Sequence, residues 1–148
     1  AALHRYTWRG DPAARTVLVD PHAAVTEGAA ARAAVAVTSR GASGWLLGKG
    51  SLARRFGGVR VFFCVEADVG AVRWGVRDGE ALRPGDGSAQ GGATGAYLSF
   101  AEPAVTLRVG LSFLSAAQAR ANLEAQARPF DSLDAASEAA AAGWEAEL

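Results

Sequence analysis

Cysteine, methionine and long apolar runs are scarce or absent in this sequence, and each shortage excludes something. The single cysteine, Cys64, excludes an intrachain disulfide, so cysteine content leaves the redox compartment open. Methionine is absent and the chain begins at Ala1, so we expect a processed chain or a segment excised from a longer one. No run approaches the roughly 20 apolar residues that a membrane span needs, and no secretory signal opens the chain.

An excess of one charge sign is also missing. Fifteen basic residues offset fifteen acidic ones, and a chain without a basic stripe lacks what phosphate backbones and anionic membrane surfaces attract. We therefore expect no nucleic acid as a partner. What the chain does have is a large apolar fraction, 50% of 148 residues. This is enough to bury the core of one domain, or of part of a larger one.

The hydrophobic pattern has mostly the period of two that strands have. It predicts strands at residues 3–8, 15–20, 33–38, 41–48, 59–68, 71–78, 94–100 and 104–114. In the strand at 59–68 both faces are apolar, as is typical of a central strand in a sandwich. Turn-forming residues predict a polar turn at 26–32 and a mobile surface loop at 84–95. The sequence is thus predicted to be mainly β, an antiparallel β-sandwich.

Two helices are predicted after the last strand. Ser115 and Gln118 have the spacing of a capping box, which places a helix directly after the strand. Pro129 ends this helix, and Asp131 or Ser132 can cap a second one. The second helix has an apolar stripe made by Leu133, Ala136, Ala140, Trp144 and Leu148.

The junction between the last strand and the first helix resembles a family signature. The run Gly110-Leu-Ser-Phe-Leu-Ser115, with Ala119-Arg120 and Asn122-Leu-Glu124, is similar to G-(I/L)-S-F-(V/L)-S-x-x-x-A-R-x-N-L-x-x-E. That signature closes the N-terminal β-sandwich domain of glycoside hydrolase family 92, the exo-acting α-mannosidases. Residues 3–8, 94–100 and 130–148 resemble further segments of the same domain and of the linker helices after it.

The resemblance implies a division of the chain and a function. Residues 1–114 would be the C-terminal part of that β-sandwich domain, and residues 115–148 the linker helices leading to an absent helical catalytic domain. The chain would be a non-catalytic part of an exo-α-mannosidase-like hydrolase, partly walling the active site of an (α/α)6 domain that processes N-glycans or mannan. Calcium and the catalytic acid and base would belong to that domain of the same parent chain, and the location would be extracytoplasmic.

No residue of this chain is assigned a catalytic, metal-binding or cofactor-binding role. A glycosidase needs two carboxyl groups flanking the scissile bond. Glu66 and Asp68 share a strand face, but we favour a solvated strand end or pairing with an arginine. His4 and His22 have no cysteine or carboxylate at ligand spacing. Cys64 lies in the most apolar strand and is predicted to be a small buried hydrophobe.

Tryptophan is the remaining residue type suited to a mannose-containing glycan, because indole faces stack on sugar rings. Periodicity predicts that Trp74 and Trp144 face cores. Trp8 and Trp45 lie at strand or turn edges and are the predicted substrate-binding residues.

A stand-alone β-sandwich carbohydrate-binding or structural module is the alternative function. It predicts a solvent-facing aromatic platform, whereas a fragment predicts exposed apolar surface on the two C-terminal helices. Around the junction, we expect Ser112, Ser115, Arg120 and Asn122 to make caps and interface hydrogen bonds rather than to catalyse a reaction.

Overall fold

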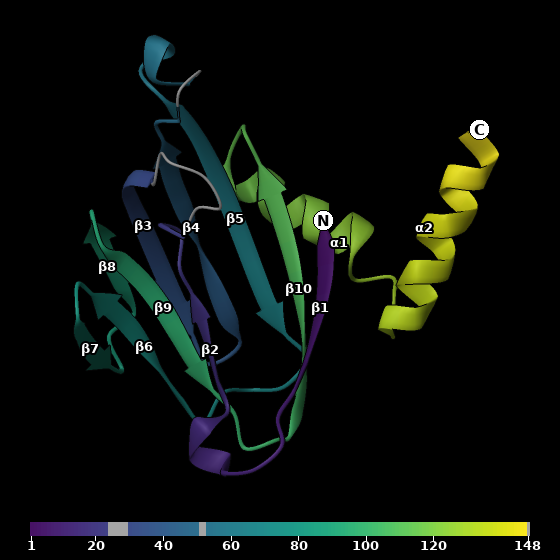
Figure 1. The fold of residues 1–148 in the computed structure, drawn as a ribbon, viewed down its shortest axis with the longest axis horizontal. Coiled ribbons are helices and arrows are strands. Elements are labelled where there is room, and N and C mark those ends of the chain that lie inside the picture. The colour runs from purple at the N-terminus through teal and green to yellow at the C-terminus, as the bar shows by residue number, and fades with distance from the viewer. Residues whose placement is uncertain (24–29, 51–52, 148) are drawn as a thin grey trace.

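Two antiparallel sheets pack face to face in the computed structural model, which describes residues 1–23, 30–50 and 53–147 (Figure 1). The six-stranded sheet has the order β1 (Ala2–Thr7), β10 (Ala104–Ser112), β5 (Val59–Ala67), β4 (Gly41–Gly48), β3 (Ala30–Thr38) and β8 (Ser88–Gly91). The four-stranded sheet has the order β2 (Thr16–Val19), β9 (Thr94–Ser99), β6 (Arg73–Asp78) and β7 (Ala81–Pro84). Two short 3-10 helices, η1 (Pro12–Ala14) and η2 (Ala53–Phe56), lie in connections. The predicted antiparallel β-sandwich is confirmed.

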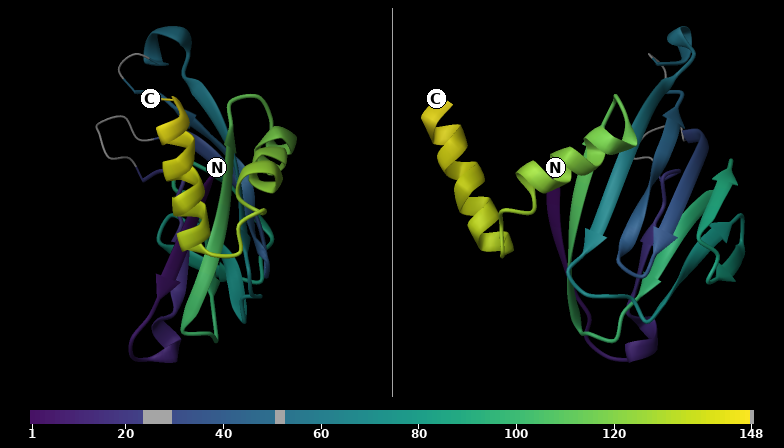
Figure 2. Two further views of the ribbon diagram at one scale, coloured as in Figure 1. Left: turned by 90° about the vertical axis from the view of Figure 1, so that its right-hand side faces the viewer. Right: turned by 180° about the vertical axis from the view of Figure 1, so that it is seen from behind.

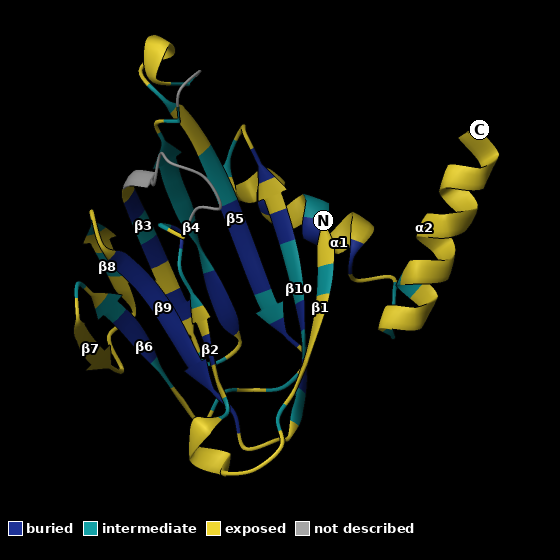
Figure 3. Ribbon diagram, viewed as in Figure 1, coloured by how far each residue is buried: buried dark blue, intermediate teal, exposed yellow. Residues whose placement is uncertain are grey.

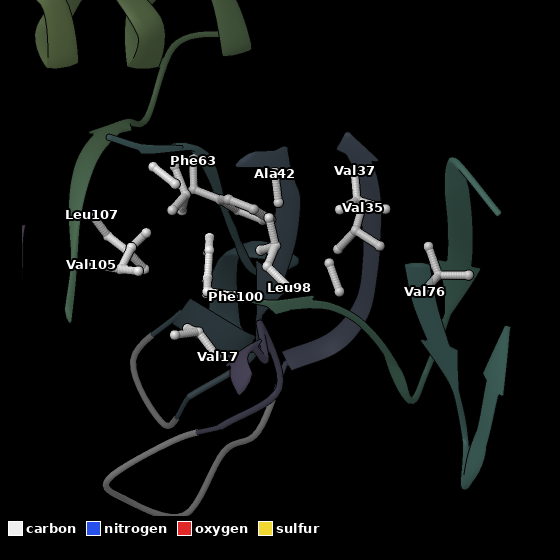
Figure 4. Packing of buried hydrophobic residues seen from close by; sticks show 13 residues of the cluster. Val17, Val35, Val37, Ala42, Phe63, Val76, Leu98, Phe100, Val105 and Leu107 are labelled. Atoms are coloured by element: carbon white, nitrogen blue, oxygen red, sulfur yellow. The ribbon is translucent and has the colours of Figure 1, made fainter. Parts of the chain in front are cut away.

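The core lies between the two sheets and is built from alternate residues of their strands. In β3, Val35 and Val37 are buried, whereas Ala36 between them is exposed. Successive side chains of a strand point to opposite faces, so the period of two in the sequence becomes a buried face. Figure 4 shows the resulting cluster, which consists of Val17, Val35, Val37, Ala42, Phe63, Val65, Ala67, Val76, Ala96, Leu98, Phe100, Val105 and Leu107.

The second apolar face of β5 is covered by a helix rather than by a sheet. β5 lies between β10 and β4, and α1 (Ala116–Gln126) packs on β5 and β10 from the side away from the core (Figure 2). Cys64 and the partly buried Phe62 form a small cluster with Ala119 and Leu123 of α1. The central position predicted from the two apolar faces is confirmed, and α1 is the second cover.

The prediction of one continuous surface loop at 84–95 is wrong. β8 and the start of β9 lie within this range, and β8 pairs with β3 at the edge of the six-stranded sheet. The Val37 N–H donates to Gly87 O at 2.9 Å and extends this edge. Glycine and serine conceal the strand because they carry no apolar pattern, although their backbone groups still pair.

The polar turn predicted at 26–32 is also partly wrong. Residues 30–32 already belong to β3, because Ala30 and Arg32 pair with β4 without adding to the apolar pattern. Residues 26–29 lie outside the described residues.

The apolar alternation of β10 continues beyond the end of the second sheet. Val105 and Leu107 are buried, whereas Leu111 is 53% and Phe113 72% exposed. The four-stranded sheet does not reach this end of β10 (Figure 1), and the strand ends at Ser112 rather than continuing to residue 114. The alternation therefore predicted the strand correctly and the burial of its last residues wrongly.

Both C-terminal helices are present, but only the first buries side chains. α2 (Leu133–Glu147) follows the break at Pro129, and Ser132 Oγ accepts a hydrogen bond from Ala135 N at 3.1 Å. α2 projects beyond the edge of the sandwich and contacts it at β1 (Figure 2), and none of its described residues is buried (Figure 3). The expectation that Trp144 faces a core is wrong, because nothing in the described chain packs over this part of α2 and the side chain is 72% exposed.

Candidate functional site

Side-chain hydrogen bonds fix the joint between β10 and α1. Ser115 Oγ accepts a bond from Gln118 N at 3.1 Å, which satisfies one donor of the first helical turn. The Gln118 side chain does not complete the capping box, because its Nε2 donates to Asn122 Oδ1 at 2.9 Å. Asn122 Nδ2 in turn donates to Leu111 O at 2.8 Å. The predicted roles of Ser115 as a cap and of Asn122 as a hydrogen-bonding residue are confirmed.

Gly110 lets α1 approach β10 closely. A Cβ at this position would lie 2.0 Å from Ala119 O and 2.8 Å from Leu123 Cβ. Such contacts are not possible, so only a glycine admits the helix to this depth. Two residues later, Ser112 Oγ accepts a bond from Leu114 N at 3.0 Å, where the strand ends. The family-like signature is thus the sequence of a strand and helix in direct contact.

Glu66 of β5 is held by arginines that follow the joint. Its Oε2 accepts a hydrogen bond from Arg128 Nη2 at 2.7 Å, and Arg120 Nη1 lies 4.0 Å from the same oxygen. Arg108 Nη2 donates to Phe130 O at 3.0 Å and secures the turn after α1. The interpretation of Glu66 as a carboxylate paired with arginine is confirmed. These bonds attach the C-terminal segment to the sheet.

Two further carboxylates are also bonded within the fold. Asp68 Oδ1 accepts a bond from Thr106 N at 3.0 Å, and Asp20 Oδ2 accepts one from Arg77 Nη2 at 2.9 Å. In the part of the chain that the structure describes, no group of three or more His, Cys, Asp or Glu residues could hold a metal ion. The carboxylates of Glu66, Asp68 and Asp20 therefore have bonds that support the sheets.

Cys64 is buried under α1, with 2% of its surface exposed. Burial raises the pKa of its thiol, and the nearby Arg120 guanidinium opposes this only in part. A thiol that stays protonated is a poor nucleophile. The prediction of a small buried hydrophobe is confirmed.

The two tryptophans predicted to bind substrate lie on opposite faces of the six-stranded sheet. Trp8 packs against the core, and its ring centroid lies 6.3 Å from that of Phe100. Trp45 of β4 is half-buried on the outer face, with the Arg60 guanidinium 4.7 Å from its ring centroid. They do not form one site, and both stay predictions. Trp74 packs against the core, as predicted.

Unpartnered apolar surface gathers at the joint and along α2. Phe113 and Leu114 are 72% and 79% exposed, and Trp144 is as exposed as Phe113. A groove of about 310 Å³ lies between α2 and the start of β1, and its lining includes Leu3, Ala127, Phe130, Leu133, Ala136 and Ala140. Apolar surface of this kind marks interaction sites. The sequence did not predict that the end of β10 is exposed. The length of its apolar run, which is greater than that of the other predicted strands, could have indicated this.

Two observations bear on how the chain meets other molecules. No helix among the described residues is long and apolar enough to cross a membrane. The exposed apolar residues of the joint and of α2 lie at the C-terminal side of the sandwich (Figure 3).

The fold is similar to that of solved structures of GH92 family enzymes. The family GH92 inverting mannosidase BT2199 of Bacteroides thetaiotaomicron shares 20% identity at a TM-score of 0.68, with 87% of this chain and 17% of that chain covered. The GH92 family glycosyl hydrolase ccman5 shares 25% identity at a TM-score of 0.78, with 97% of this chain and 19% of that chain covered. The chain therefore spans less than a fifth of the length of these relatives.

The sequence of this chain matches a protein family but no curated protein. Residues 1–112 match the Glycosyl hydrolase family 92 N-terminal domain, which is most of the chain and ends at the last residue of β10. The chain therefore belongs to glycosyl hydrolase family 92.

Proposed function

We propose that this chain is a non-catalytic part of an exo-α-mannosidase-like glycoside hydrolase. In that parent, residues 1–114 form the β-sandwich and residues 115–148 form linker helices that lead to an (α/α)6 catalytic domain. The sandwich packs on that domain and walls part of its active site. The observation that carries the proposal is the unpartnered apolar surface of α2 and of the joint, on a chain that covers only 17–19% of its structural relatives.

The state of α2 supports the docking part of the proposal. A helix of 15 residues is marginal in water unless one face packs, yet no residue of α2 is buried. Its stripe contains Leu133 and Trp144, which are 43% and 72% exposed. A helical domain packed along this stripe would bury both side chains, with a gain of about 1.5–3 kcal/mol for each fully buried large apolar side chain.

The firmness of the joint is consistent with a supporting role. Gly110 seats α1 on β10, and the Arg128–Glu66 ion pair fixes the far end of the helix to β5. A domain connected through α2 would thus start from a fixed point on the sandwich. That arrangement suits a wall that must hold its place beside an active site.

The chemistry of the parent follows from its relatives and is part of the proposal. Hydrolysis of an α-mannosidic bond with inversion needs an acid and a base on either side of the bond, with room for a water. We assign this pair and a calcium ion to the helical domain, and the substrate is a mannose-containing glycan such as an N-glycan or mannan. The location proposed for the parent is extracytoplasmic.

The proposal is tested with the purified chain and with its full-length parent, using an aryl α-mannoside with calcium. We expect hydrolysis by the parent and none by residues 1–148. Hydrolysis by the chain alone would show that the catalytic residues are misplaced. A parent gene that encodes no helical domain beside this one would overturn the docking role and favour a stand-alone module.

In the parent, Asn122→Ala separates support from catalysis. The change removes the bond to Leu111 O and should lower the stability of domain docking, by about 1 kcal/mol for one hydrogen bond. Thermal unfolding and turnover should therefore fall together. Full stability with abolished turnover would contradict the supporting role of the joint.

A further inference from the structure

A polar trough lies on the outer face of the six-stranded sheet, beside α1. It has a volume of about 370 Å³, in the range of small-molecule sites. In Figure 2, the view from behind shows this face, with α1 over β10 and β5 and the outer faces of β3 and β4 left uncovered. The floor is made of small residues, and the polar groups around it are Thr38, Arg40, Ser43, Glu66, Arg120 and Arg128.

The trough presents acceptors and donors together. Glu66 uses Oε2 for Arg128 at 2.7 Å and for Arg120 at 4.0 Å, and no described residue bonds its Oε1. The Arg40 guanidinium likewise makes no bond to a described residue. The Glu66 side chain is 23% exposed, and those of Arg120 and Arg128 are 55% and 50% exposed, so all three reach solvent.

The trough carries three arginines and one carboxylate, and this mixture of donors and acceptors can bond the hydroxyls of a neutral sugar. Each hydroxyl of a hexopyranose both donates and accepts, so it can bond a carboxylate oxygen and a guanidinium N–H at once. Glu66 sits between Arg120 and Arg128 and neutralises one of their two charges, so an anion bound between these arginines would also meet a carboxylate. The small floor formed by Ala36 and Gly41 lets a sugar ring approach the backbone.

An aromatic side chain stands on the same face. Trp45 lies two residues after Ser43 on β4, so the two side chains share one side of the sheet. The Arg60 guanidinium, 4.7 Å from the ring centroid, holds the indole in place. A second sugar unit extending from the trough along β4 would meet this indole.

We propose that the trough is a surface glycan-binding site for a neutral hexopyranose. Glu66 and Arg40 bond the sugar hydroxyls, and Trp45 contacts the next unit. That the sugar is mannose rests on the proposed function; the neutral polyhydroxyl chemistry rests on the trough alone. The site would hold the enzyme on the glycan whose ends are being removed.

Titration of the isotope-labelled chain with α-mannobiose, followed by NMR, tests the site. We expect saturable millimolar binding with shifts confined to residues 36–45, Glu66 and the facing side of α1. Arg40→Gln and Glu66→Gln should each weaken binding at least about fivefold, the effect of one lost hydrogen bond to a charged group. Arg5→Gln is the matched control, because Arg5 is an exposed strand arginine of β1, and it should change nothing.

Three results would overturn the site. The first is that α-mannobiose does not saturate the folded chain. The second is that neither Arg40→Gln nor Glu66→Gln weakens binding. The third is that inorganic phosphate displaces the sugar. Arg40→Gln keeps the proposal testable if Glu66→Gln disturbs the fold, since Arg40 has no ion pair with a described residue. The titration needs no catalytic domain. If the chain does not bind the sugar but the parent hydrolyses an α-mannoside, only the trough proposal is contradicted.

If the chain binds the sugar but its parent has no helical domain, only the proposed function is contradicted.

Discussion

Single residues set the fit of α1 on the sheet. Gly110 occupies a position where a Cβ would meet Ala119 O at 2.0 Å, and Cys64 fills the space beneath Ala119 and Leu123. Neither position could take a larger side chain without moving the helix. The role of both residues at this contact is therefore packing.

Gly110→Ala should destabilise the chain by roughly 1–3 kcal/mol or more, because the new methyl group forces α1 away from β10. Thermal or urea unfolding measures the loss. Gly143→Ala is the control: nothing lies within 4 Å of its added Cβ, and alanine should strengthen α2 by about 1 kcal/mol of helix propensity. Equal effects of the two changes would contradict the close contact at Gly110.

The Cys64 thiol should make stability fall at alkaline pH. Its pKa is raised in the folded chain by burial, so the unfolded chain loses this proton first. Stability from the protonated thiol is present below the unfolded pKa of about 8.5 and is lost as pH rises toward the folded pKa.

Urea unfolding on both sides of this pH, with Cys64→Ala for comparison, isolates the effect. The variant should lose less stability than the unmodified chain, by up to about 1.4 kcal/mol for each pKa unit of the shift. Identical pH dependence would show that the thiol does not titrate differently in the two states.

The two C-terminal helices differ although both were predicted from similar signals. α1 buries Ala119 and Leu123, whereas α2 buries nothing. An apolar stripe tells which face of a helix needs cover and cannot tell whether this chain supplies it. The structure covers Ala119 and Leu123 of α1 and leaves the stripe of α2 exposed.

Trp144→Ala should therefore leave the isolated chain almost unchanged, within about 0.5 kcal/mol, as surface substitutions usually do. Leu123→Ala is the matched control on α1, and it should cost about 2–5 kcal/mol because that side chain is fully buried. In the parent, by contrast, Trp144→Ala should lower the stability of the protein, because the catalytic domain would cover this side chain. A large loss in the isolated chain would mean that α2 already packs on the sandwich.

At the scale of the whole molecule, the core between the two sheets is covered on both sides, whereas the apolar residues of α2 and at the end of β10 are exposed. The core cluster draws residues from both sheets, so this part has what an independently stable body needs. α2 and the exposed end of β10 lie outside that core (Figure 3). Under the proposed function, the missing contacts are those of the catalytic domain.

Hydrogen exchange should reveal this unevenness. In the isolated chain, amides of β5, β9 and β10 should be the slowest to exchange, and those of α2 should exchange fastest, because opening α2 exposes no buried side chain. In the parent, α2 should become strongly protected. Equal protection of the α2 amides in the isolated chain and in the parent would contradict the packing of a catalytic domain on α2.

The order of residues along the chain was enough to predict most of the strands, both helices and the apolar face of each predicted strand. Val35 and Val37 alternate with smaller or polar neighbours, and Ser115 caps its helix, through interactions that reach only a few residues along the chain. The family resemblance was also fixed at this level, because Gly110 and Asn122 stand at set distances along the signature.

Which apolar faces are covered depends on how the strands and helices pack in three dimensions. Val105 and Leu107 of β10 are buried, whereas Leu111 and the following Phe113 are exposed, since the second sheet does not reach this end of the strand (Figure 1). This packing also makes a strand of β8 and brings distant polar side chains, among them that of Glu66, around one trough. Burial and side-chain gathering depend on where distant segments meet, and the local pattern of residues does not contain that information.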